Sequence, residues 1–137
     1  MKRTATAIWN GSGKEGGGNL TTQSKVLDKM QYSYSSRFEN GTGTNPEELI
    51  AAAHAGCFSM KLSFVLGADG FTPDWIETHC TITLDSGTIT ESHLDVKAKV
   101  KGFDKEKFEA FVIEAKDTCP VSKLLKANIT YKATLHH

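Results

Sequence analysis

A long apolar stretch from Leu49 to Leu66 limits what this chain can fold into more than any other feature. The stretch is barely long enough to cross a lipid bilayer. Its polar members are His54, Ser59, Lys61 and Ser63. These side chains favour a helix in the core of a domain over a membrane span. A chain of 137 residues has room for one such domain, so we expect residues 1–137 to form a single fold around this helix.

Capping residues predict where the helix begins. Asn45 is a favourable N-cap and Pro46 suits the first helical position. Glu47 and Glu48 then lie near the positive end of the helix dipole. The helix is expected to run to about residue 66 and to end at Gly67. It is rich in alanine and glycine and apolar nearly all round, so we expect it to be buried on most sides.

Alternating patterns predict β-strands on both sides of this helix. Short strands are expected at residues 4–9, 19–24 and 32–38, with a closing strand at residues 128–135. Residues 75–84 and 94–101 alternate between apolar and polar side chains. This alternation is typical of an antiparallel hairpin with one solvent-facing side.

A second helix is expected to begin at Asp104 and to end at Cys119. Its apolar residues recur at helical spacing as one stripe, which places Cys119 on the core side. Pro120 disfavours helical geometry at Cys119 and can open a short further helix through Leu125. Strands and helices in this order, without regular alternation, predict an α+β fold.

Composition excludes several classes of function. Sixteen basic and sixteen acidic residues give no net charge, and no basic face is visible, so we expect no nucleic-acid partner. The first residues lack the apolar segment of a secretion signal. Three cysteines are an odd number and too few for a small disulfide framework. We therefore expect a cytoplasmic protein without membrane attachment, whose thiols are reduced.

Cys57 and Cys119 suit thiol-based peroxide chemistry. A thiolate can break the weak O–O bond of a peroxide, and a second thiol then converts the resulting sulfenic acid to a disulfide. Cys57 lies in the mostly buried helix, and Cys119 lies at a helix start, where the dipole favours a thiolate. From these residues alone, an inert buried pair of cysteines is the stronger interpretation.

Three motifs in order along the chain resemble a known family. Residues 43–50 (GTNPEELI) with 52–60 (AAHAGCFSM), residues 119–122 (CPVS) and residues 36–38 (SRF) resemble the motifs of the osmotically inducible protein C (OsmC) family. That family is related to the organic hydroperoxide resistance (Ohr) proteins. The resemblance covers essentially the whole chain, and His54 with the residues after Cys57 favours the OsmC branch.

The resemblance implies a function and roles for four residues. It implies an organic hydroperoxide reductase with Cys57 as the peroxidatic cysteine and Cys119 as the resolving one. Arg37 matches the arginine that favours the thiolate, and Glu47, rather than Glu48, matches the carboxylate that pairs with it. A fixed guanidinium stabilises negative charge on sulfur, and a carboxylate holds its fork in place. The small apolar residues around Cys57 favour organic hydroperoxides over hydrogen peroxide.

The resemblance also implies an assembly and a reductant. The family forms an intertwined homodimer, with antiparallel sheets wrapped around buried central helices and active sites at the subunit interface. It uses no haem, flavin or metal, and dithiols such as lipoyl groups are implied as reductants. Ten residues separate Glu47 from Cys57, or ~15 Å along a helix. Either the segment at Pro46 hooks back, or Glu47 serves the Cys57 of the other subunit, as two-fold packing of the helices favours.

Other interpretations remain beside these roles. Cys80 is expected to be a small core residue. His54 lies three residues before Cys57, a spacing that leaves open a Cys-His hydrolase pair or a metal site. A buried hydrogen bond is the favoured role of this histidine. Arg37 and Glu47 also suit a merely structural ion pair. A non-enzymatic redox sensor or binding protein on the same fold is the alternative function.

Overall fold

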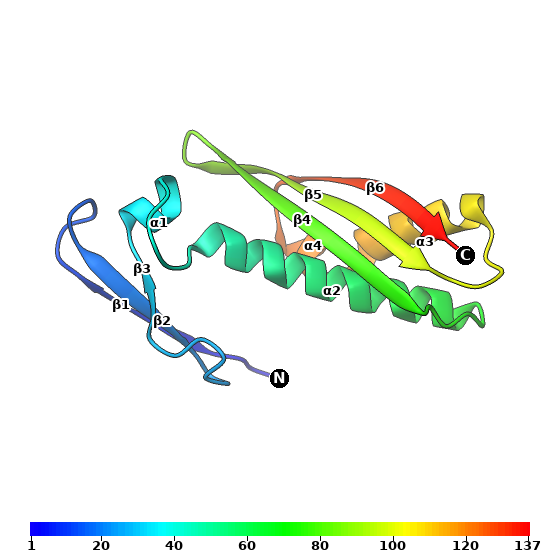
Figure 1. Cartoon of the computed structure of the whole chain (residues 1–137), viewed down its shortest axis with the longest axis horizontal. Helices are drawn as coiled ribbons and strands as arrows, with labels where there is room; N and C mark the ends of the chain where they lie inside the picture. Colours follow the sequence, from blue (N-terminus) through cyan, green and yellow to red (C-terminus); the bar gives the residue numbers. More distant parts are fainter. The chain divides into compact units, whose positions relative to one another are not determined.

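The computed structural model describes all 137 residues and divides the chain into two units, Met1–Leu49 and Ile50–His137. The order of elements is three strands, a short helix, a long helix, a two-stranded hairpin, two helices and a last strand (Figure 1). This order confirms the predicted α+β class. That residues 1–137 act as one domain stays a prediction, and the two units are described separately.

The first unit contains a three-stranded antiparallel sheet. Its strands are β1 (Ala5–Asn10), β2 (Gly17–Thr22) and β3 (Met30–Tyr32), with β2 in the middle. The expectation of a strand over residues 32–38 is wrong, because β3 ends at Tyr32 and a short helix, α1 (Tyr34–Phe38), follows. Ser33 and Ser36 form a capping box: each side chain accepts a hydrogen bond from the other's backbone N–H. Such reciprocal bonds start a helix where the sequence pattern suggested a strand.

The long helix α2 (Pro46–Ala68) begins where the sequence predicted. The Asn45 side chain accepts a hydrogen bond from the Glu48 backbone N–H at 2.8 Å, which confirms Asn45 as the N-cap. The helix continues to Ala68, one residue past the expected end at Gly67. The chain then turns at Gly70, whose φ of 86° lies in the left-handed region that glycine adopts without strain.

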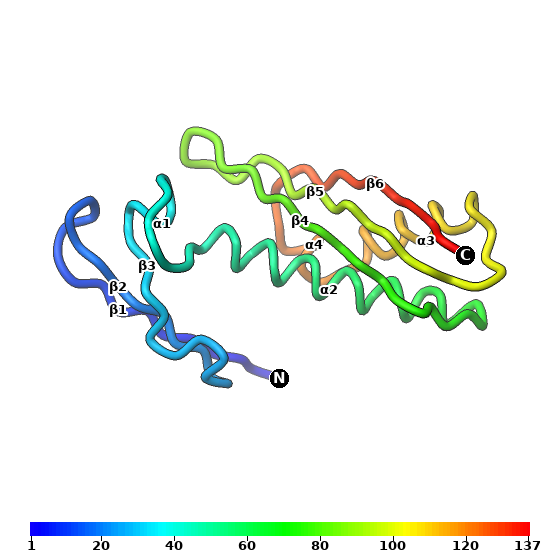
Figure 2. The backbone as a smooth tube through the Cα atoms, viewed as in Figure 1, coloured from blue at the N-terminus to red at the C-terminus, as the bar shows by residue number.

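The second unit contains a three-stranded mixed sheet, drawn as adjacent traces in Figure 2. Strands β4 (Trp75–Asp85) and β5 (Thr88–Lys99) form the predicted antiparallel hairpin. Strand β6 (Asn128–His136) runs parallel to β5, so the expectation of antiparallel sheets holds for the sheet of the first unit and, in this sheet, for the hairpin alone. The connection from β5 to β6 passes through α3 (Lys105–Thr118) and α4 (Pro120–Leu124), the kind of long crossover that a parallel pair needs.

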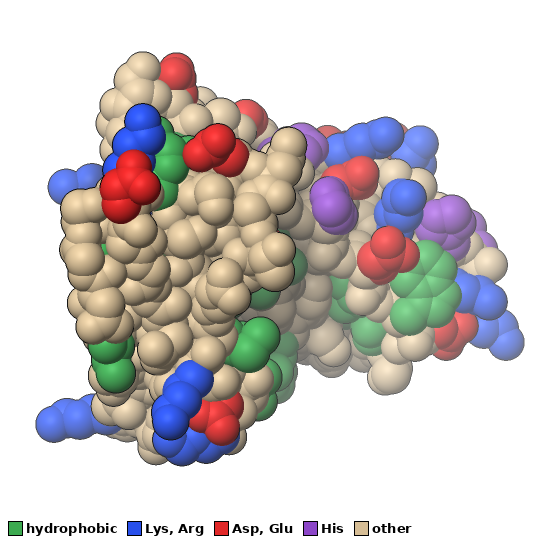
Figure 3. Space-filling view, turned by 60° about the vertical axis from the view of Figure 1, so that its left-hand side comes forward, with side chains coloured by type: hydrophobic (Ala, Val, Ile, Leu, Met, Phe, Trp, Pro, Cys, Tyr) green, Lys and Arg blue, Asp and Glu red, His purple; other side chains and the backbone are tan.

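Helix α2 buries one face only, against the expectation of burial on most sides. The buried positions recur every fourth residue at His54, Phe58, Leu62 and Leu66. They belong to a core with the inward-facing side chains of β5 and α3, which include Leu94, Val96, Phe108 and Val112. Met60 and Phe64, on the opposite face of the helix, are 65% and 68% exposed. Hydrophobic side chains also remain visible on the surface in Figure 3.

The exposed face of α2 leaves its burial unfinished within one chain. By length and composition α2 also meets the criteria for a membrane span, as do many core helices of soluble proteins. Phe58, Leu62 and Leu66 nevertheless pack into the core of the second unit. The opposite face therefore presents exposed apolar side chains.

Candidate active site

Cys57 lies on α2, one position before the buried Phe58, and is half-buried. Its helical position puts it at the edge between the core face and the exposed face. An open pocket lies beside it, lined by Met60, Lys61, Phe64, Thr118, Pro120 and Lys123. Apolar side chains and two lysines thus surround the opening to the Cys57 sulfur.

Cys119 lies at the junction between α3 and α4. Its backbone is extended, with φ of −62° and ψ of 128°, as expected for the residue before a proline. Its backbone N–H donates to the Ala115 carbonyl at 2.9 Å and closes the end of α3. The side chain is fully buried, which confirms the prediction that Cys119 faces the core.

The structure brings the Cys57 and Cys119 thiols together. All three cysteines are free, and Cys57 and Cys119 are close enough for the Cys119 thiol to raise the pKa of Cys57. Burial raises the pKa of the Cys57 thiol above its ordinary value, and the neighbouring Cys119 thiol raises it further. The Val121 backbone N–H and the positive charge of Lys61 act in the opposite direction and lower this pKa.

The start of α4 affects the pKa of Cys57, whereas the sequence suggested an effect on Cys119. We expected the helix dipole to favour a thiolate on Cys119, but the Cys119 side chain makes no capping bond. The backbone N–H of Val121, in the first turn of α4, instead lowers the pKa of the Cys57 thiol. The segment that follows Cys119 therefore also contributes to the environment of Cys57.

In the first unit, Arg37 and Glu47 form the predicted pair. Arg37 Nη2 and Nε lie 2.8 and 2.9 Å from Glu47 Oε1. Glu48 takes a different partner, because its carboxylate accepts a hydrogen bond from Thr44 Oγ1 at 2.8 Å. The geometry thus agrees with the choice of Glu47 over Glu48 as the partner of Arg37. The catalytic role of the pair stays a prediction.

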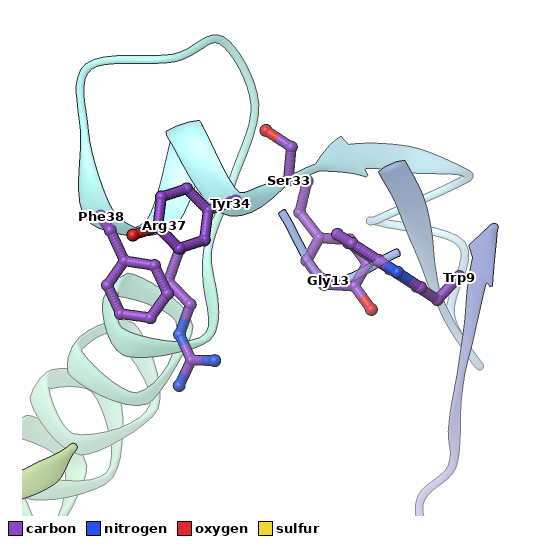
Figure 4. A pocket seen from close by; sticks show the side chains of 7 residues that line it. Trp9, Gly13, Ser33, Tyr34, Arg37 and Phe38 are labelled. Atoms are coloured by element: carbon purple, nitrogen blue, oxygen red, sulfur yellow. The ribbon is translucent and has the colours of Figure 1, made fainter. Parts of the chain in front are cut away.

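Arg37 also belongs to an aromatic pocket that sequence reasoning missed. In Figure 4 the side chains of Tyr34, Arg37 and Phe38 rise from α1 on one side, with Trp9 on the other. The guanidinium lies over the Phe38 ring at 5.0 Å, in cation–π geometry. The i, i+4 spacing of Tyr34 and Phe38 around Arg37 would have signalled this pocket, had residues 32–38 been recognised as helical.

Gly18 shapes the far wall of this aromatic pocket. The Trp9 and Tyr32 rings lie with centroids 5.3 Å apart. A Cβ on Gly18 would lie 2.7 Å from Trp9 and 2.8 Å from Tyr32, too close for any side chain. Glycine at this position therefore permits the two rings to form the wall.

Two further polar residues have structural partners. Both ring nitrogens of His54 bind serine hydroxyls, those of Ser92 and Ser122. The favoured interpretation, a buried hydrogen bond, is confirmed, and a Cys57-His54 hydrolase pair is wrong for this geometry. Cys80 lies on the inward side of β4 and contacts Ser92 Oγ at 3.2 Å, which agrees with a packing role.

The chain is similar to known proteins over most of its length. The model of the family described as OsmC-like protein matches residues 39–134. Peroxiredoxin OsmC of Escherichia coli is 47% identical over 134 residues, 95% of this chain and 94% of that protein. Organic hydroperoxide resistance protein OhrB of Bacillus subtilis is 32% identical over 120 residues, 86% of this chain and 88% of that protein. The crystal structure of OhrB superimposes with a TM-score of 0.63 at 28% identity, over 97% of this chain and 98% of that one. From its ordered motifs, its fold and these matches, the chain belongs to the OsmC family.

Proposed function

We propose that this protein is a thiol-dependent peroxidase that reduces organic hydroperoxides to alcohols. The observation that carries the proposal is the pairing of the Cys57 and Cys119 thiols, one beside an open apolar pocket and the other fully buried. The half-buried Cys57 thiol beside the pocket is placed to meet a substrate, and the buried Cys119 thiol is protected from it. The printed names of the OsmC and OhrB relatives agree with this activity.

The reaction divides into three balanced steps. The Cys57 thiolate attacks one peroxide oxygen, an S–O bond forms and the O–O bond breaks, and the alkoxide takes up a proton and leaves as the alcohol. The Cys119 sulfur then attacks the Cys57 sulfenic acid, an S–S bond forms, and hydroxide leaves as water with the thiol proton. A dithiol finally reduces the disulfide and is itself oxidised. Lipoyl groups are the dithiols we propose as the reductant.

The raised pKa of Cys57 explains why the reaction needs Arg37. Within the second unit, burial outweighs the Val121 N–H and Lys61, so the thiol form is favoured. The attacking species is the thiolate, which requires a further positive charge close to the sulfur. We propose that the Arg37 guanidinium, oriented by Glu47, supplies that charge and stabilises the departing alkoxide.

A homodimer provides a route for this arrangement. The exposed Met60 and Phe64 face of α2 is apolar and suits the same face of a second chain. Glu47 lies in the first turn of α2 and Cys57 farther along the same helix. We propose that Arg37 and Glu47 of one subunit complete the site around Cys57 of the other.

A peroxide-reduction assay tests the proposed function. Purified protein is mixed with cumene hydroperoxide and dithiothreitol, and peroxide consumption is followed over many equivalents of protein. Wild type is expected to turn over repeatedly, whereas Cys57→Ser is expected to be inactive. Oxidation of only one equivalent of peroxide, despite excess dithiol, would instead favour a redox sensor and would overturn the proposal.

A further inference from the structure

A buried hydrogen-bond chain connects the segments that carry the two reactive cysteines. His54 is fully buried on α2. Its Nδ1 lies 2.6 Å from Ser92 Oγ on β5, and its Nε2 lies 2.7 Å from Ser122 Oγ on α4. A neutral imidazole has one N–H donor and one acceptor, and a hydroxyl can complement either. All the polar atoms of this histidine are therefore satisfied by two serines from distant parts of the chain.

The two ends of the His54–Ser122 bond have a specific relation to the cysteines. His54 lies three residues before Cys57, about one helical turn away on α2. Ser122 lies three residues after Cys119, within the short helix that Cys119 caps. The bond therefore joins the Cys57 helix to the Cys119 segment from inside the core.

Few side chains hold helix α4 in position: Val121 is partly buried against the core, and Ser122 is buried. It contains five residues, far fewer than an independently stable helix needs. Leu124, near its end, is 76% exposed and contributes little packing. Ser122 is the buried residue of this helix, and its hydroxyl bonds to His54. Loss of this bond is expected to free the Cys119 segment more than the rest of the fold.

We infer that His54 and Ser122 are positioning residues for the resolving step: their hydrogen bond holds Cys119 within reach of the Cys57 sulfenic acid. This inference rests on the proposed peroxidase function. Attack of Cys119 forms the S–S bond and breaks the S–O bond of Cys57, so it needs the two sulfurs in line. Oxidation of Cys57 by peroxide forms and breaks no bond at the Cys119 sulfur. A looser α4 is therefore expected to slow resolution selectively.

Two serine variants form a matched pair for testing this inference. Ser122→Ala and Ser92→Ala each remove one hydroxyl from the same histidine, but only Ser122 is on α4. Each protein is exposed to one equivalent of cumene hydroperoxide without reductant. Sulfenic acid is trapped with a dimedone-type reagent, and disulfide formation is followed by loss of free thiol. Ser122→Ala is expected to accumulate Cys57 sulfenic acid and to form disulfide about tenfold more slowly.

The controls separate positioning from general destabilisation. Ser92→Ala is expected to form disulfide at nearly the wild-type rate, and Ser122→Thr, which keeps the hydroxyl, is expected to restore it. Equal slowing in both alanine variants, or none in Ser122→Ala, would overturn the inference. If Ser122→Ala does not fold, His54→Gln is compared with Ser92→Ala, because His54→Gln removes both native bonds and Ser92→Ala removes only the bond to Ser92.

A second measurement does not depend on peroxide at all. The protein is equilibrated with reduced and oxidised glutathione, and the equilibrium constant for formation of the Cys57–Cys119 disulfide is measured. This constant is larger when the two thiols are held closer together. Ser122→Ala is expected to lower this equilibrium constant by about tenfold relative to Ser92→Ala. Failure of the wild type to reduce peroxide would refute the proposed function, whereas equal equilibrium constants in the two variants would refute the positioning role.

Discussion

Two nitrogens of Arg37 contact the same carboxylate oxygen of Glu47: Nη2 and Nε lie 2.8 and 2.9 Å from Oε1. The carboxylate is largely covered, with 13% of its side chain exposed, whereas Arg37 is 41% exposed. The second carboxylate oxygen, Oε2, is buried without a partner. The Glu47 carboxylate is mostly buried, whereas the Arg37 guanidinium is partly free. This arrangement suits a pair in which Glu47 orients the guanidinium and Arg37 contacts the reacting groups.

Neutralising Glu47 is expected to weaken the activation of Cys57. In Glu47→Gln the guanidinium loses its oriented, charge-assisted contact, so less positive charge is held near the sulfur and the pKa of Cys57 rises. A rise of about one unit corresponds to a tenfold loss of thiolate at neutral pH. The pH dependence of Cys57 alkylation, measured in a background without the other cysteines, reports this pKa.

Glu48→Gln is the matched control for this experiment, because Glu48 contacts Thr44 instead of Arg37. Its alkylation profile is expected to match that of the wild type. Arg37→Met is expected to exceed the effect of Glu47→Gln. An unchanged profile in both Arg37→Met and Glu47→Gln would show that the ion pair has only a structural role.

Replacing each cysteine by serine is expected to have a different effect on peroxide turnover, according to the role of that cysteine. Without added thiol, Cys119→Ser should oxidise at Cys57 and stop after one turnover, with a sulfenic acid at that residue. Cys80→Ser should keep full turnover, since Cys80 contacts only the buried Ser92 hydroxyl and the core. Mass spectrometry of the peroxide-treated proteins identifies the oxidised residue. A dead Cys80→Ser beside a fully active Cys119→Ser would reverse the assignment.

The aromatic pocket at Arg37 is expected to set preference among hydroperoxides. Tyr34 and Phe38 offer ring faces beside the guanidinium, with ring centroids 5.0 Å apart. An aryl or alkyl group gains apolar contact there that hydrogen peroxide cannot gain. Tyr34→Ala should therefore raise KM for cumene hydroperoxide by about tenfold and leave the rate with hydrogen peroxide nearly unchanged. An equal loss with both peroxides would place the pocket outside substrate recognition.

Sequence patterns predicted the parts of the fold that depend on local rules. The N-cap at Asn45, the cap at Asp104 and the break before Pro120 all follow from side-chain chemistry within a few residues, and all three are present. The β4–β5 hairpin was equally visible, because one face alternates inward along its whole length. The pairing of Arg37 with Glu47 followed from the family motif.

One error is local, because a capping box starts a helix where a strand was expected over residues 32–38. The other errors concern long-range relations that a pattern cannot encode. Strand β6 is parallel to β5 because of the path that the α3–α4 connection takes. The residue pattern at 128–135 is the same for a parallel and an antiparallel strand, so it does not predict the direction. The apolar surface of α2 indicated burial without saying whether the cover comes from the same chain. The bond between His54 and Ser122 joins residues 68 positions apart, so only the fold reveals it.

The buried imidazole predicts a loss of stability in mild acid. Burial lowers the pKa of His54 below its ordinary value of 6.5, so the folded chain binds this proton less readily than the unfolded chain. As the pH falls below about 6.5, the unfolded state gains the proton first and the free energy of unfolding decreases. Urea unfolding between pH 7.5 and pH 5.5 measures this slope, which is at most ~1.4 kcal/mol per pH unit for one proton. His54→Gln, although less stable at pH 7.5, should show a flatter slope; an unchanged slope would assign the effect to other groups.

The position of Glu47 relative to Cys57 leads to a test of the composite site. Both residues lie on the continuous helix α2, ten positions apart, which corresponds to ~15 Å along its axis. If the helix is straight over this length, a guanidinium that contacts Glu47 at 2.8 Å is too far from the Cys57 sulfur to act on it. If two subunits pack through the exposed face at Met60 and Phe64, the start of one helix can approach the middle of the other.

Mixing two inactive homodimers tests this arrangement directly. Cys57→Ser lacks the nucleophile and Glu47→Ala lacks the orienting carboxylate, so each homodimer should be inactive or nearly so. After subunit exchange, a mixed dimer pairs an intact Cys57 on one chain with an intact Glu47 on the other. Activity should then recover to about a quarter of the wild-type value, because half of the dimers are mixed and each contains one complete site. Exchange is verified with differently tagged chains, and a Cys57→Ser, Glu47→Ala double variant mixed with Glu47→Ala is the control that should recover nothing. Verified exchange without any recovery would mean that Glu47 serves the Cys57 of its own chain.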